Sequence, residues 1–214
     1  MKEGMFITLE GPEGSGKTSH MAPLTKWLEG LGRQVLCTRE PGGTPISEQI
    51  RAVIHDLKNK EKHPHTETLL YQAARAQIVE QVIRPALTRG VIVLCDRYAD
   101  STLAYQGYGH QQDLDEVRAL IHYATGGLQP DLTLLLDVEA ETGLKRSSQR
   151  RSKGGEWNRL DAYELEFHQR VREGYLELVK AEPQRWVIVD ASMRWQDVHS
   201  ALRQAISDRL KSED

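Results

Sequence analysis

The chain has 214 residues, 39% of them hydrophobic, and a formal net charge of −3. Its length and apolar content suit one sizeable core, so we expect residues 1–214 to form a single domain. The slight negative charge excludes a global positive field, which predicts no nucleic-acid partner. No apolar run approaches the ~18 residues of a membrane helix, and no signal-peptide pattern opens the chain. We therefore expect no membrane contact and a cytoplasmic location.

The N-terminal residues predict a buried strand followed by a phosphate-binding loop. Residues 5–9 are apolar, and residues 11–18 read Gly-Pro-Glu-Gly-Ser-Gly-Lys-Thr. The glycines let successive N–H groups face a triphosphate, in conformations that side chains would obstruct. Lys17 should reach the β- and γ-phosphates, and the Thr18 hydroxyl should hold Mg²⁺. An ordinary glycine turn is the weaker alternative. We expect ATP to bind along Gly11, Pro12, Glu13, Gly14, Ser15, Gly16, Lys17 and Thr18.

Four more apolar runs predict strands, and helical patterns separate them. They cover residues 34–38, 91–95, 132–137 and 186–189. Strands that are buried on both faces and joined by helices form a parallel sheet, so the expected fold class is α/β. Cys37 and Cys95 lie inside two of these runs, and we expect both to be reduced core side chains.

Caps, glycines and prolines predict the helices. The first helix should end near residues 30–32, and Thr66 should cap a long helix toward Gly90 that Pro85 kinks or shortens. Asp113 should cap the next helix, which the glycines at 126–127 end. Further helices are expected at about 140–151, 162–181 and 196–210. The polar stretches 56–65 and 147–158 should be loops, and two histidines in the first are too few to favour a metal site.

The run that ends at residue 95 continues with Asp96 and Arg97, a pair that suits phosphate chemistry. At the carboxyl end of a strand, a guanidinium can bind phosphate oxygens while the carboxylate organises metal or water. A surface ion pair is the alternative. The chain lacks the Asn-Lys-x-Asp signature of guanine-nucleotide switches, and Arg97 stands where a motor ATPase more typically has Glu. These features favour a kinase.

Three further motifs, taken with the loop, resemble the thymidylate kinase family, mainly its bacterial branch. They are Thr-Arg-Glu-Pro-Gly-Gly-Thr at 38–44, Leu-Leu-Tyr-Gln-Ala-Ala-Arg at 69–75, and Asp-Arg-Tyr with Asp-Ser-Thr-Leu-Ala-Tyr-Gln-Gly within 96–107. The likeness covers nearly the whole chain. It implies a P-loop nucleoside-monophosphate-kinase fold, with parallel strand order 2-3-1-4-5 and helices on both faces. It also implies Mg²⁺-dependent transfer of the ATP γ-phosphoryl group to dTMP, giving dTDP for dTTP biosynthesis, usually by a homodimer.

The resemblance also implies which residues bind the acceptor's sugar and phosphate. Glu13 would meet the deoxyribose 3′-hydroxyl. Arg97 would clamp the acceptor phosphate, helped by Arg39 and Gln106.

On the same grounds, four residues would surround the thymine and its sugar. Thymine would stack on Tyr71, where the family mostly has Phe; an aromatic ring suffices for stacking. Arg75 and Ser101 would read the pyrimidine edge, and Tyr105 would crowd the sugar's 2′ position. For Tyr71 and Arg75, the alternative is an ordinary helix with an apolar and a solvated face.

A mobile lid is implied at about residues 147–158. One branch of the family has an arginine directly after the loop carboxylate, where this chain has Gly14, so the positive charge must come from elsewhere. Arg150 aligns best with the family's lid arginine. Arg159 matches a second arginine, although Asn158 replaces an Asp common in the family, and Arg146 would stack on adenine. A solvated charge run is the alternative. The expected catalytic residues are Lys17, Asp96, Arg97, Arg150 and Arg159.

Two other functions stay open at this point. One is a kinase for a different small acceptor, although Arg97 with Gln106 favours an acceptor that already bears phosphate. The other is a nucleotide-dependent switch that binds ATP without transferring phosphate, which Asp96, Arg97 and the lid arginines disfavour.

Overall fold

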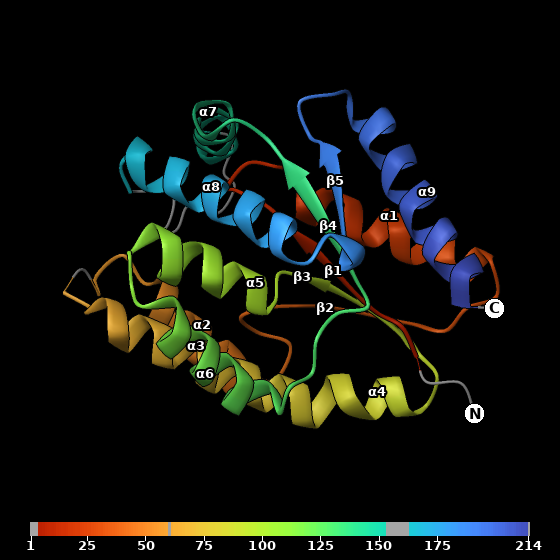
Figure 1. Ribbon diagram of the computed structural model, residues 1–214, viewed down its shortest axis with the longest axis horizontal. Coiled ribbons are helices and arrows are strands. Elements are labelled where there is room, and N and C mark those ends of the chain that lie inside the picture. The colour runs from red at the N-terminus through yellow and green to blue at the C-terminus, as the bar shows by residue number, and fades with distance from the viewer. Residues whose placement is uncertain (1–3, 60, 153–162, 214) are drawn as a thin grey trace.

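The computed structural model describes residues 4–59, 61–152 and 163–213 (Figure 1). Its centre is a five-stranded sheet of order β2-β3-β1-β4-β5, and every neighbouring pair is parallel. The expected fold class and strand order are therefore confirmed. The strands are β1 (Phe6–Glu10), β2 (Val35–Arg39), β3 (Ile92–Asp96), β4 (Leu132–Asp137) and β5 (Trp186–Asp190).

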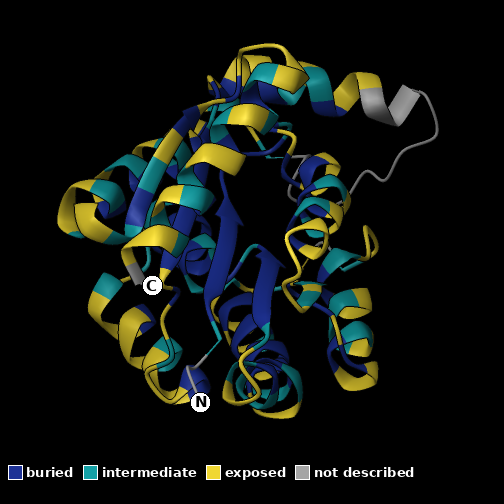
Figure 2. Cartoon of the chain, turned by 90° about the vertical axis from the view of Figure 1, so that its right-hand side faces the viewer, coloured by how far each residue is buried: buried dark blue, intermediate teal, exposed yellow. Residues whose placement is uncertain are grey.

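Side chains along β1 point alternately to the two faces of the sheet, and apolar ones occur on both, which explains why helices cover both faces. Ile7 and Leu9 pack on one side against α1 (Lys17–Gly30) and α9 (Trp195–Glu213). Phe6 points to the other side and packs against Ile78 of α3 (Pro64–Ile78). The sheet consequently lies between helices whose outer faces are exposed (Figure 2). No helix in the described part of the chain is long and apolar enough to cross a membrane.

The long helix differs from its prediction at its start, and its regular α-helical part stops at Ile78, before the proline. It begins at Pro64, and His63 rather than Thr66 caps it, because the His63 ring nitrogen accepts from the backbone N–H of His65. Pro85 does not end the helical path. A π-helical segment, Val79–Ile83, leads directly into α4 (Arg84–Thr88), which contains the proline. The wider turn directs the N–H of Arg84 to the carbonyl of Val79.

One helix, α2 (Pro45–His55), was not predicted although the sequence carries its start signal. Thr44 caps it by accepting from the backbone N–H of Ser47, and Pro45 occupies the first turn, where a missing N–H costs nothing. The short α5 (Ala99–Thr102) and the π-helical segment Leu103–Gly109 were also missed.

The remaining helices begin and end close to the expected residues. Asp113 caps α6 (Leu114–Thr125) and the left-handed Gly126 ends it, as predicted. The others are α7 (Ala140–Ser152), α8 (Leu165–Ala181) and a short 3₁₀ turn, Pro183–Arg185. Because α7 continues to Ser152, the expectation of a loop at 147–158 was wrong for residues 147–152. Both cysteines are free, but only Cys95 is a core residue. The prediction for Cys37 was wrong, because β2 is an edge strand and leaves that side chain exposed.

Candidate active site

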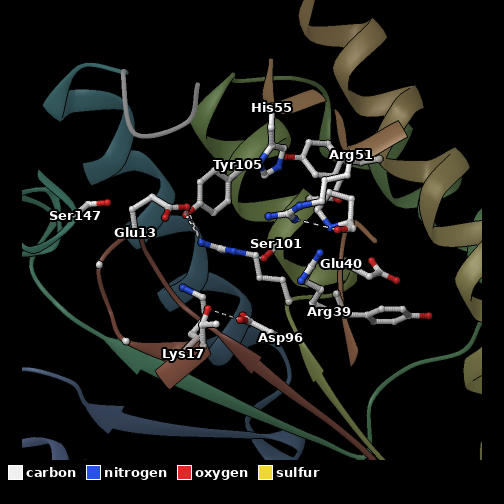
Figure 3. Close-up of a pocket in the computed structure, with 18 of the residues that line it drawn as sticks. Glu13, Lys17, Arg39, Glu40, Arg51, His55, Asp96, Ser101, Tyr105 and Ser147 are labelled. Atoms are coloured by element: carbon white, nitrogen blue, oxygen red, sulfur yellow. Dashed lines mark hydrogen bonds and ion pairs between the residues drawn. The ribbon is translucent and has the colours of Figure 1, made fainter. Parts of the chain in front are cut away.

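A cavity of about 590 Å³ opens beyond the carboxyl ends of the central strands (Figure 3). This is where parallel α/β sheets place ligands, because the loops that leave neighbouring strands diverge there. Arg150 belongs to α7, but its side chain lies outside the described part of the structure, and Arg159 and Asn158 lie wholly outside it. The expected site residues that line the cavity are Glu13, Gly14, Gly16, Lys17, Thr18, Arg39, Tyr71, Arg75, Asp96, Arg97, Ser101, Tyr105, Gln106 and Arg146.

The loop between β1 and α1 is held in shape by its own lysine. The ammonium of Lys17 donates to the carbonyls of Gly11 and Pro12, each at 2.9 Å, and to the Ser15 hydroxyl at 3.0 Å. Burial, and after it the charge of Arg97, lowers the pKa of Lys17 to about 8. No side chain caps the start of α1. The first N–H groups of this helix are therefore suited to bind an anion.

The same loop packs backbone to backbone against the first turn of α7. A Cβ atom added at Gly14 would collide with the carbonyl oxygen of Gly143, and one added at Gly143 would collide with the carbonyl of Glu13. Gly14 also has a φ of 70°, which L side chains rarely adopt. The phosphate loop and the base of α7 are consequently in direct contact. Arg146 lies on that helix, lines the cavity and donates to the carbonyl of Ala191.

Two oxygen ligands lie together at the floor of the cavity. The Thr18 hydroxyl donates to a carboxylate oxygen of Asp96 at 2.6 Å. Hydroxyl and carboxylate oxygens are the hard ligands that Mg²⁺ prefers, with water and substrate phosphate completing its shell. The described residues contain no group of three or more His, Cys, Asp or Glu that could enclose a metal, so His63 and His65 form no such centre there. Thr18 and Asp96 together fit a metal ion that is also held by the phosphates of a substrate.

Arg97 is the most extensively bonded side chain of the site. One terminal nitrogen donates to a Glu13 carboxylate oxygen at 2.6 Å and to the Tyr105 hydroxyl at 3.1 Å. The other donates to the carbonyl of Gly11 and to the hydroxyls of Ser101 and Tyr175. Its backbone φ is 70°, an uncommon value for a residue other than glycine and typical of functional positions.

The ion pair with Arg97 keeps the carboxyl group of Glu13 ionised. Burial opposes ionisation of this carboxyl group, but Arg97, followed by Lys17, outweighs it and lowers the pKa of Glu13 to about 2. The Tyr105 hydroxyl also donates to Glu13, at 3.0 Å. Glu13 is therefore a carboxylate at neutral pH that can accept from a ligand hydroxyl.

The sequence analysis did not identify a further buried carboxylate, Glu10, which shares hydroxyl partners with Arg97. Glu10, at the end of β1, accepts from the backbone N–H of Tyr98 and from the hydroxyls of Ser101 and Tyr175. Burial, with a smaller contribution from Asp100, raises the pKa of Glu10 to about 7. Its hydrogen bonds hold the hydroxyls of Ser101 and Tyr175, two of the three hydroxyls that accept from Arg97. Its position directly before the glycine loop was the available signal.

On another wall, Arg75 is almost wholly enclosed. It donates to Glu40, Gln72 and Thr102, and to the backbone carbonyl of Tyr98. Four of its five N–H groups are therefore used within the protein.

Two other residues of the cavity, Gln106 and Arg39, also bond within the chain. Gln106 donates to the buried carboxylate of Glu67 at 3.1 Å, and Arg39 donates to both carboxylate oxygens of Glu48. Tyr71 is 9% exposed and faces the same cavity.

Two residues of α2, which no motif indicated, line the same cavity. Figure 3 shows Arg51 and His55 together at the end away from Lys17 and Asp96. Burial, and after it the charge of Arg51, lowers the pKa of His55 to about 4, so its ring is neutral at pH 7. The buried Nε2 of His55 has no hydrogen-bond partner among the described residues. Because α2 itself was not predicted, nothing in the sequence pattern indicated that His55 lies in the site.

Comparisons with known proteins all point to one family. The family model described as "Thymidylate kinase" matches residues 9–202. The thymidylate kinase of Roseiflexus sp. (strain RS-1) is 53% identical over 195 residues, covering 87% of this chain and 86% of that protein. The thymidylate kinase of Deinococcus radiodurans is 48% identical over 209 residues, covering 98% and 99%. The crystal structure of thymidylate kinase from Ehrlichia chaffeensis superposes with a TM-score of 0.77 at 31% identity, covering 96% of this chain and 99% of that one.

Proposed function

The chain belongs to the thymidylate kinase family, and we propose that it transfers the γ-phosphoryl group of ATP to dTMP, giving ADP and dTDP. One observation carries the proposal beyond the family name. Two cationic groups suited to phosphate, Lys17 in the glycine-rich loop and the guanidinium of Arg97, line one cavity. A phosphoryl transfer between two phosphorylated molecules needs both.

Each element has a distinct task in the proposed reaction. The ammonium of Lys17 would exchange its hydrogen bonds to the loop carbonyls for bonds to the β- and γ-phosphates of ATP. Arg146 would stack on the adenine ring. Thr18 and Asp96 would hold Mg²⁺, which neutralises charge that develops on the phosphate oxygens. Arg97 would bind the acceptor phosphate and so orient its oxygen for in-line attack.

The acceptor's sugar and base would lie between Glu13 and the far wall. Glu13 would accept from the 3′-hydroxyl, because its carboxylate is ionised and faces the cavity. Tyr71 would provide the stacking face, and Tyr105, whose ring lies under the guanidinium of Arg97, would limit space at the sugar. Arg75 and Ser101 would contact the pyrimidine edge, and Gln106 and Arg39 would assist at the acceptor.

We place the remaining positive charge on a lid at about 147–158, part of which lies outside the described residues. Arg150 should act mainly in the transition state, and Arg159 should support it. Arg150→Ala should then lower kcat roughly 10³-fold by analogy with arginine fingers, with little change in the dTMP dissociation constant. Arg151→Ala is the matched control and should cost much less. A larger loss in Arg151→Ala would shift the assignment by one residue.

An acceptor panel tests the proposed function. ADP release with ATP and Mg²⁺ should be fastest with dTMP, weaker by a modest factor with dUMP, and near background with thymidine, dGMP or no acceptor. One methyl group is worth only ~1–3 kcal/mol, so dUMP should not be rejected outright. Equal turnover of dGMP would favour a different kinase. ATP binding without any acceptor-dependent ADP release would favour a switch.

We further propose that residues 1–214 act as one catalytic domain, in a cytoplasmic homodimer. Light scattering on the purified chain tests the dimer, and cell fractionation tests the compartment. A monomer at micromolar concentration would contradict the first.

A further inference from the structure

Glu10 is a buried carboxylate whose side-chain partners also contact Arg97. Its Oε2 accepts from the hydroxyl of Ser101 at 2.6 Å and from that of Tyr175 at 2.9 Å. Both hydroxyls accept in turn from the same terminal nitrogen of Arg97, at 3.1 and 3.3 Å. Glu10 has no exposed surface, so it can act on a ligand only through these partners.

The backbone fixes which way round a side chain at position 10 can bond. The other oxygen of Glu10, Oε1, accepts from the backbone N–H of Tyr98 at 2.7 Å, so this place requires an acceptor. A hydroxyl has one proton to donate and lone pairs with which to accept. As a carboxylate, Glu10 takes the protons of both hydroxyls at Oε2, which leaves their lone pairs for Arg97. The two hydroxyl oxygens lie 2.9 Å apart, and neither has to donate to the other.

An amide at position 10 would reverse these hydrogen bonds. Its oxygen would have to face the N–H of Tyr98, and its NH₂ group would then face the two hydroxyls as a donor. The hydroxyl protons would turn toward the guanidinium of Arg97, which can only donate. A protonated carboxyl group would cause the same conflict at one of the two hydroxyls.

The surroundings of Glu10 allow its charge to change near neutral pH. Burial, and after it the charge of Asp100, raises the pKa of Glu10 to about 7, although Arg97 acts in the opposite direction. Burial also raises the pKa values of the Cys95 thiol and the Tyr175 phenol, so both stay neutral there. The charged and titratable groups that act on Glu10 or respond to it are Arg97, Asp100, Lys17, Cys95 and Tyr175.

We propose that Glu10 is a positioning residue for the acceptor phosphate, because its carboxylate turns the hydroxyls of Ser101 and Tyr175 so that they hold the guanidinium of Arg97 in place. The inference rests on the proposed function, in which Arg97 binds the phosphate of dTMP. A misplacement of ~1 Å in such a group can cost ~10²-fold in rate. The glycine-rich loop binds the donor through other groups, so ATP should be affected much less.

The experiment compares two changes from carboxylate to amide in the full chain. Glu10→Gln reverses the hydrogen bonds, whereas Asp131→Asn is the matched control. Asp131 accepts from the backbone N–H of Phe6 at the opposite end of β1, and an amide oxygen can still do so. At pH 8, Glu10→Gln should raise the dTMP dissociation constant, measured by calorimetry without ATP, about tenfold. The KM for ATP should stay within a few-fold, and Asp131→Asn should leave both values as in wild type.

The pH dependence separates this role from a purely structural one. At pH 6 Glu10 of the wild type is itself mostly protonated, so the ratio of the two dTMP dissociation constants, Glu10→Gln to wild type, should fall to a few-fold. Titration of the dTMP phosphate is common to both proteins and cancels in this ratio. A ratio that is the same at pH 6 and pH 8 would overturn the proposal, as would an unchanged dissociation constant in Glu10→Gln at pH 8.

A second variant tests the hydroxyl that connects Glu10 to Arg97. Tyr175→Phe keeps the ring and removes one acceptor of Arg97, so it should weaken dTMP binding a few-fold. Glu10→Gln should cost less in that background, since one of the two reversed hydroxyls is absent. If Glu10→Gln does not fold, unchanged dTMP binding in Tyr175→Phe would still overturn the proposal. If the wild type binds dTMP but transfers no phosphoryl group, the proposed function fails, and the dissociation constants decide the role of Glu10. A wild type that binds no dTMP would refute both.

Discussion

Arg97 and Arg185 both pair with a buried carboxylate, yet the surroundings of the two pairs differ. Arg185, just before β5, grips both oxygens of Asp100 at 2.8 Å and also bonds Thr133 and Glu182. Arg97 donates to one oxygen of Glu13, to the hydroxyls of Ser101 and Tyr105, which line the cavity, and to the carbonyl of Gly11. Arg185 is not among the residues that line the cavity. We expect the bidentate pair away from the cavity to stabilise the fold, and the Arg97–Glu13 pair, whose residues line the cavity, to act on a ligand.

The largest effect should come from Arg97→Ala. Removing the guanidinium would delete the proposed contact with the acceptor phosphate, and it would leave Glu13 as a carboxylate without its ion-pair partner that repels phosphate. We expect kcat/KM for dTMP to fall about 10³-fold, the upper range for loss of one group that stabilises the transition state. Steady-state assays at saturating ATP measure it. Near-normal activity of Arg97→Ala would show that Arg97 contributes neither to acceptor binding nor to catalysis.

Arg185→Ala should have the opposite signature. Asp100 is 3% exposed and would be left as a buried charge without its partner, so the free energy of unfolding should fall by about 3–5 kcal/mol. Urea titration measures this loss, and kcat/KM below the melting transition should stay close to wild type. A stable Arg185→Ala protein with reduced activity would reverse the distinction between the two pairs.

Acid titration should distinguish the Arg97–Glu13 pair from the Arg185–Asp100 pair, because the pKa of Glu13 is strongly lowered. Its pKa in the folded protein, about 2, lies below the ordinary glutamate value of 4.5. Its ionisation therefore stabilises the fold fully above pH 4.5, and this contribution, about 3 kcal/mol, is lost as pH falls toward 2. Glu13→Gln should abolish that part of the pH dependence. Identical stability curves for wild type and Glu13→Gln between pH 5 and 2 would contradict it.

The smallest expected effect is a pH dependence of ATP affinity that arises from Lys17. It should respond to substitution of Arg97 but not of Arg185. Its lowered pKa of about 8 means that the free enzyme loses this charge as pH rises through 8, so ATP affinity should fall above that value. Because Arg97 is the second cause of the shift, Arg97→Ala should move the midpoint upward. Arg185→Ala should leave it unchanged. Calorimetric titrations of ATP from pH 6.5 to 9.5 measure the midpoints.

Much of the fold followed from local patterns, whereas part of the site did not. The apolar run before the glycine loop and the cap at Asp113 act within a few residues, so they predicted β1 and α6 correctly. Cys37 was misplaced because the composition of a strand does not reveal whether it forms the edge of the sheet. Glu10 and His55 were missed for a related reason. What each group bonds depends on chain segments far away, and no spacing in the sequence records whether Nε2 of His55 finds a partner.

The contact between Gly14 and Gly143 sets a constraint on how this enzyme can vary. The family branch that places an arginine after the loop carboxylate needs room for a side chain at position 14. Here the backbone of α7 occupies that room, and Gly143 in turn has no space for a side chain against Glu13. An arginine at position 14 would therefore require α7 to move away from the loop, because a side chain there would collide with the backbone of Gly143.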